Sequence, residues 1–159
     1  MKLPNAEDGT TQRARRCSVE EPPAAQSHYD YADAFEVTLR EGDHRSAEQI
    51  FRDGLERAPS ALRSVILIVH RRVLRLDVGP AFWPIVASEP DMVRLEATGP
   101  LIAGALVARR IDGRTSRLTT FVTYRGPLAR IVWPLVAPLH RRVAPYLMER
   151  AAAKPAESA

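Results

Sequence analysis

Turn-forming residues recur at short intervals in the second half of the chain and divide it into short segments. The turns fall at residues 89–91, at Gly99 and Pro100, at Asp112 and Gly113, and at Gly126 and Pro127. The segments between them span residues 82–88, 92–98, 101–111 and 114–124, and they are rich in the apolar and β-branched residues typical of strands. Because strands joined by turns this short pair antiparallel, the sequence predicts an antiparallel meander.

One further strand and two helices are predicted before the meander. Phe35, Val37 and Leu39 alternate with smaller or polar residues, which favours a half-buried strand with these three side chains inward. Ser46 followed by Gln49 forms a capping box, which predicts a helix running to about residue 57. A second helix starts at Pro59 and Ser60, and its expected buried stripe comprises Leu62, Val65, Ile66, Val69, Val73 and Leu76.

Apolar residues spaced three or four apart after Pro127 predict a long last helix that packs on the sheet. This expected stripe comprises Leu128, Val132, Leu135, Leu139, Val143 and Leu147. Pro134, Pro138 and Pro145 interrupt the pattern, and since each removes a backbone hydrogen bond, a kinked or interrupted helix is expected. The order of elements predicts an α+β fold in which a curved antiparallel sheet grips the C-terminal helix, the helix-grip arrangement.

Polarity divides the chain into one domain and two tails. Residues 1–27 and 152–159 contain too little apolar surface to offset the entropy of ordering, so a disordered leader and tail are expected around a domain over residues 28–151. The N-terminal residues lack the apolar core of a signal peptide, and the longest apolar run, residues 65–69, is far shorter than a membrane span of about 20 residues. With Cys17 as the single cysteine, these features predict a cytoplasmic protein without a membrane span.

Four segments resemble the domain of unknown function DUF2867: residues 30–37, 85–91, 118–122 and, most closely, 131–147, where IVW leads to APLHRRVAPYL. The resemblance covers about residues 29–151. It implies a fold of the START-related (SRPBCC) helix-grip superfamily, whose members often bind apolar small molecules between sheet and helix. The family has no settled activity, so no catalytic residue is implied. Pro84 departs from the family pattern and predicts an edge strand or a local irregularity.

A ligand site between the sheet and the last helix is the leading functional hypothesis. The small residues Ala103, Gly104 and Ala105 are expected to leave room beneath the helix. The site would hold a small apolar or amphipathic molecule, with Thr120 and His140 orienting its polar end and no cofactor. The residues expected to line it are Trp83, Ile85, Leu106, Thr120, Val122, Trp133, Val136 and His140.

Two alternatives stay open. In the first, side chains fill the cavity and the domain is a protein-interaction module or a homodimer. In the second, an enzyme with cyclase- or hydrolase-like chemistry uses His140, which requires a carboxylate facing it inside the pocket. Asp30, Asp33 and Glu36 cluster at the first strand, but we interpret them as a solvated strand edge. The scattered histidines predict no metal site, and we favour a non-enzymatic role.

The net charge of +4 comes from arginine, since the chain has only two lysines. Arg109, Arg110, Arg114 and Arg117 flank a hairpin turn, but no aromatic residues interleave them, so a solvated hairpin is expected and no nucleic-acid partner. His70, Arg71, Arg72 and Arg75 follow the apolar run at residues 65–69. This basic amphipathic helix fits either an anionic membrane surface or burial of one face on the sheet.

Overall fold

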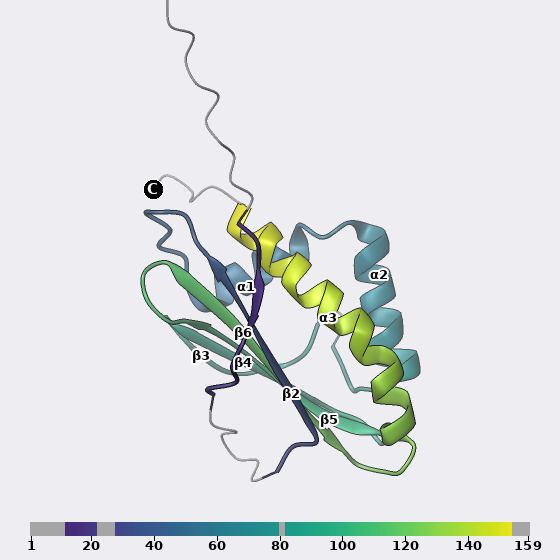
Figure 1. Ribbon diagram of the computed structural model, residues 1–159. Helices are drawn as coiled ribbons and strands as arrows, with labels where there is room; N and C mark the ends of the chain where they lie inside the picture. Colours follow the sequence, from purple (N-terminus) through teal and green to yellow (C-terminus); the bar gives the residue numbers. More distant parts are fainter. Residues whose placement is uncertain (1–11, 22–27, 80–81, 154–159) are drawn as a thin grey trace, which may run out of the picture.

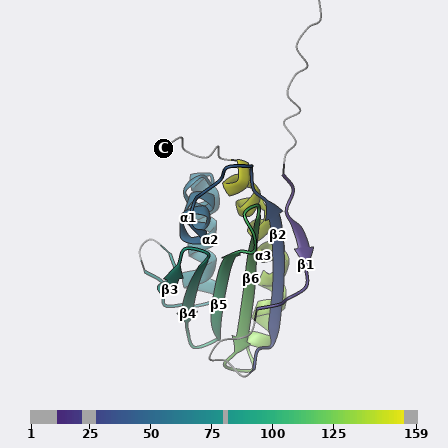
Figure 2. The ribbon, with the colours of Figure 1, turned by 90° about the vertical axis from the view of Figure 1, so that its left-hand side faces the viewer.

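The computed structural model describes residues 12–21, 28–79 and 82–153 as a six-stranded antiparallel sheet with three helices on one of its faces (Figure 1, Figure 2). The elements are β1 (Arg15–Cys17), β2 (Tyr31–Thr38), α1 (Ala47–Glu56), α2 (Ser60–Ile68), the π-helical turn η1 (Val69–Val73), β3 (Ile85–Glu89), β4 (Met92–Thr98), β5 (Ile102–Arg110), β6 (Thr115–Tyr124) and α3 (Ala129–Ala153). The strand order is β1-β2-β6-β5-β4-β3. The predicted α+β class, with an antiparallel sheet under a long C-terminal helix, is confirmed.

The strand and the helix start predicted at the beginning of the domain are both present in the structure. Phe35, Val37 and Leu39 are buried and place the helix-facing side of β2 at its odd-numbered residues. Ser46 caps α1 through a hydrogen bond from the Gln49 backbone, and the Gln49 side chain accepts from the Ser46 backbone in return. This reciprocal pair fixes where α1 begins.

The strand at Pro84 is an irregular edge strand, as its proline predicts. β3 begins after Pro84, lies at the end of the sheet, and shifts register against β4 between Ile85 and Ala87. The chain before it places the Trp83 indole on β5, where a Cβ added at Gly104 would lie 2.5 Å from Cη2 of Trp83. The room that the small residues of β5 were expected to leave for a ligand is therefore partly filled by Trp83.

The expected disordered leader is wrong for residues 12–21. β1 pairs with β2, with Arg15 opposite Glu36 and Cys17 opposite Ala34, and Val19 packs on the sheet face away from the helices. These residues gain backbone hydrogen bonds and ion pairs from the sheet, which sequence polarity alone does not reveal. At the other end, Ala152 is buried in α3 rather than part of a tail. Residues 1–11, 22–27 and 154–159 lie outside the described residues.

Of the kink or interruption expected at its prolines, the interruption is wrong, because helix α3 runs from Ala129 to Ala153 without a break. The predicted apolar stripe is also wrong for Leu128, Leu135 and Leu139, which are exposed. The buried face consists of Ala129, Trp133, Ala137, Ala144, Met148, Ala151 and Ala152. Small alanines let the helix approach the sheet closely, which explains why they form the inner face. In α2 and η1, Val65 and Val73 are exposed as well, and only Ile66 is buried.

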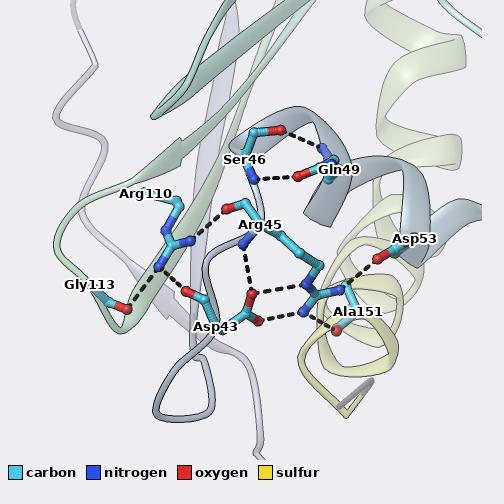
Figure 3. A network of polar contacts seen from close by, with 8 residues as sticks. All are labelled: Asp43, Arg45, Ser46, Gln49, Asp53, Arg110, Gly113 and Ala151. Carbon is cyan, nitrogen blue, oxygen red and sulfur yellow. Dashed lines mark hydrogen bonds and ion pairs between the residues drawn. The ribbon is translucent and has the colours of Figure 1, made fainter. Parts of the chain in front are cut away.

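Arg45 joins the N-terminus of α1 to the C-terminus of α3 (Figure 3). Its guanidinium donates to Asp43 at 2.6 Å, to Asp53 at 2.7 Å and to the Ala151 carbonyl at 3.0 Å. Arg110 of β5 donates to the backbone carbonyls of Arg45 and Asp43, which fixes the same loop to the hairpin. The network thus holds the helical layer on one end of the sheet.

Candidate functional site

An apolar cavity of about 100 Å³ lies between the sheet and the helices. Seven of the eight residues predicted for the ligand site line it: Trp83, Leu106, Thr120, Val122, Trp133, Val136 and His140. Ile85 does not; it lines a separate groove between α1, α2 and the β3–β4 edge, because the irregular start of β3 turns it away. Val65 and Leu139 line the cavity and are also exposed, so its mouth lies between α2 and α3.

Sequence reasoning missed the wall that α1, α2 and η1 contribute. Phe51, Ile66, Val69 and His70 line the cavity from these elements. The signal was present for Ile66 and Val69, which belong to the predicted stripe of the second helix, but nothing in the stripe showed that it faces a cavity rather than solid core.

Two polar atoms in the cavity wall have no hydrogen-bond partner among the described residues. They are the Thr120 hydroxyl and the Trp133 indole N–H, both buried. Thr119 is buried and equally unpartnered, but as the neighbouring residue of β6 it points to the opposite sheet face. Because a buried polar group without a partner costs about 1–3 kcal/mol, the two cavity atoms favour a bound molecule that offers them one.

Asp33 faces His140 from the sheet, with its carboxylate 3.2 Å from His140 Nε2 and its side chain wholly buried. The Tyr31 hydroxyl donates to the same carboxylate at 2.5 Å. Burial works to raise the pKa of Asp33, but the contacts with His140 and Tyr31 outweigh it and hold that pKa below its usual value. The interpretation of Asp33 as part of a solvated edge is wrong: it shares the odd-numbered, inward side of β2 with Phe35, and β1 covers the edge.

His70 is the second histidine of the cavity wall. Trp83 Nε1 donates to His70 Nδ1 at 3.2 Å, which leaves the ring proton on Nε2 in the neutral form. Burial, and secondly repulsion from His140 when that ring is protonated, lower the pKa of His70 to about 4. His70 therefore stays neutral well below pH 6.5, where an exposed histidine gains its proton.

The arginines of the hairpin and the single cysteine form contacts within the protein. Arg109 and Arg117, expected to be solvated, pair with Glu21 and Glu36, and Arg110 binds backbone carbonyls. Burial and the charge of Glu36 raise the pKa of the Cys17 thiol, which makes it less reactive. Within residues 12–21, 28–79 and 82–153, no cluster of potential metal ligands is found, and no described helix is long and apolar enough to cross a membrane.

Comparison with protein-family models, with curated proteins and with solved structures gave no match for this chain. The resemblance to DUF2867 therefore stays a prediction, and the site has to be interpreted from its own geometry.

Proposed function

We propose that the domain binds a small, mainly apolar molecule with one polar end in the cavity between the sheet and helices α2 and α3. The observation that carries the proposal is the pair of unpartnered polar atoms, Thr120 Oγ1 and Trp133 Nε1, in a wall that is apolar apart from these residues and two histidines. Apolar pockets with few, well-placed polar groups are typical of small-molecule sites. The apolar wall supplies affinity, at about 0.8 kcal/mol for each buried methylene, and the polar pair orients the ligand.

The size of the cavity limits the ligand. Its volume of about 100 Å³ is smaller than the roughly 150 Å³ of an engineered cavity that accepts benzene. The cavity as it stands suits a short alkyl chain, and a single ring fits only if the cavity wall yields slightly. A longer ligand requires α2 to move outward, and α2 contributes only Ile66 to the buried residues.

Phenol and toluene form a matched probe pair for this site, since they differ by one hydroxyl group. We expect the protein to bind phenol more tightly than toluene, and Thr120→Val to reduce that preference about fivefold, the value of one hydrogen bond near 1 kcal/mol. Titration calorimetry measures both affinities. Thr119→Val is the control, because it makes the same change on the opposite sheet face.

Native mass spectrometry of the purified protein, followed by denaturing extraction, identifies a co-purifying ligand directly. Trp133→Ala is expected to lower the affinity for that ligand. A protein that carries no ligand and binds neither probe would contradict the proposal and favour an interaction module with a filled core.

A second candidate is proton-transfer chemistry at His140, which the position of Asp33 favours. The enzyme hypothesis requires a carboxylate facing His140 inside the pocket, and Asp33 lies 3.2 Å from it. A carboxylate that accepts the Nε2 proton leaves Nδ1 unprotonated, so that His140 would act as the base while Asp33 and Tyr31 position it.

Ring opening of a nitrobenzisoxazole tests this candidate, because the reaction needs only proton abstraction and releases a coloured phenolate. We expect His140→Ala to lower the rate about a hundredfold and Asp33→Asn to shift the pH–rate profile. His70→Asn, which alters the other cavity histidine, should leave the rate nearly unchanged. Equal rates for the protein and His140→Ala would rule the candidate out.

A further inference from the structure

The outer surface of the helical layer carries large apolar side chains in contact with solvent. On α3, Leu135 is 76% and Ile131 is 63% exposed, and on α2, Ile68 is 57% exposed. The full set, here called the helical surface, comprises Val65, Ile68, Val73, Leu128, Ile131, Leu135 and Leu139. A cluster of this kind is uncommon on a monomer and marks an interaction site.

These residues form two neighbouring rows. Leu128, Ile131, Leu135 and Leu139 follow one another at three or four residues, so they lie along one side of α3, opposite the buried Trp133 and Ala137. Val65 and Ile68 form the corresponding row on α2. The two helices lie side by side on the same face of the sheet (Figure 1). Residues of both helices line the apolar cavity.

In the stretches of sequence that carry the apolar rows of the helical surface, every charged residue is basic. No acidic residue occurs between Arg57 and Leu76, or between Gly113 and Met148. Arg72 follows Ile68 by four residues and Arg142 follows Leu139 by three, so each continues an apolar row, and both are exposed.

We propose that the helical surface binds an anionic lipid bilayer, with its apolar rows at the acyl boundary and its arginines at the headgroups. Apolar residues flanked by arginine without acidic residues are the composition of interfacial helices. A two-fold dimer through this surface would instead place arginines opposite arginines, which disfavours a second copy as the occupant. Val65 and Leu139 also lie at the mouth of the cavity, but the proposal depends on the exposed rows as a whole and holds whether or not the cavity contains a ligand.

Co-sedimentation with vesicles tests the proposal. We expect binding to vesicles of phosphatidylglycerol and phosphatidylcholine, weak binding to phosphatidylcholine alone, and a loss of affinity as salt is raised. The double variant Ile131→Ser, Leu135→Ser should lower the partition coefficient at least about tenfold, since two apolar side chains are lost. Arg72→Gln with Arg142→Gln should lower it by roughly fivefold for each arginine on anionic vesicles.

Val86→Ser is the matched control, because Val86 is 52% exposed but lies on edge strand β3, away from the helical surface. It should bind as the unchanged protein does, and thermal unfolding should show that all variants are folded. Equal binding to neutral and anionic vesicles would overturn the proposal. So would a loss of vesicle binding in Val86→Ser as large as the loss in the double variant Ile131→Ser, Leu135→Ser. So would a dimer in light scattering that Leu135→Ser converts to monomer, since the surface would then be occupied by a second copy.

Discussion

Arg45→Ala is expected to lower the free energy of unfolding by about 3–5 kcal/mol, the cost of removing one partner from a buried ion pair. The side chains of Arg45 and Asp43 are 10% and 0% exposed. Burial works to raise the pKa of Asp43, and hydrogen bonds from Arg45 outweigh it and keep the carboxylate charged. Without the guanidinium, this buried charge loses its side-chain partner, and the loop before α1 loses its hydrogen bond to the Ala151 carbonyl of α3. Urea unfolding followed by circular dichroism measures the change.

Arg52→Ala is the matched control for this prediction. Arg52 pairs with Glu48 on the same helix, but it is 54% exposed, so its loss should cost no more than about 0.5 kcal/mol. Replacing Arg45 and Asp43 together, by methionine and asparagine, should cost less than the sum of the single changes, because the wholly buried charge of Asp43 is removed together with its partner. A loss below about 1 kcal/mol in Arg45→Ala would show that the network contributes little.

Lowering the pH from 7 to 4.5 is expected to reduce the free energy of unfolding by about 2–3 kcal/mol through His70 alone. In the unfolded chain a histidine binds its proton below about pH 6.5, whereas burial keeps His70 neutral in the folded protein until about pH 4. Between these values the unfolded state holds more protons, so stability rises with pH and falls as the solution is acidified. Urea titrations at several pH values measure this slope.

His70→Asn isolates the contribution of His70, since asparagine cannot take the proton yet offers an oxygen near the Nδ1 position that accepts from Trp83. The variant should lose much of the pH dependence in this window. Asp33 and Asp43, whose pKa values are lowered in the folded protein, affect the free energy of unfolding at lower pH. The stability that their carboxylates contribute is lost only as the pH falls below their unfolded pKa values near 4. An unchanged slope in His70→Asn would show that His70 is hydrated when folded.

Strand and turn signals made most of the fold predictable. The predicted segments 92–98 and 114–124 correspond to β4 and β6 within one residue, because the turns between them depend on local chemistry. The faces of α3 were not predictable by the same reasoning. Two apolar rows run along this helix, one of leucine and isoleucine and one mainly of alanine, and periodicity favours the row with larger side chains. Packing on the sheet selects the smaller one.

The site was predictable in its sheet residues and in His140, but not in Asp33 and His70. Thr120 and Val122 follow from strand parity, whereas Trp133 lies outside the predicted stripe of the last helix and was included as an aromatic side chain. The parity that places Phe35 inward also places Asp33 inward, so the carboxylate beside His140 was available from the sequence, but a lone aspartate is more often exposed. His70 could not be assigned, because its burial depends on Trp83 and on the π-helical turn, which have no sequence signal here.

The short strand β1 has a consequence for how copies of this protein meet one another. An unpaired strand edge can hydrogen-bond to another chain and start aggregation. One end of the sheet is occupied by β1, which is three residues long and carries Arg15 and Arg16, and the other by β3, whose shifted register and preceding Pro84 disrupt a regular edge. A chain shortened to begin at residue 28, as polarity alone would suggest, exposes the eight-residue β2 as a template for strand addition. Residues 12–21 thus protect the sheet from self-association as well as extending it.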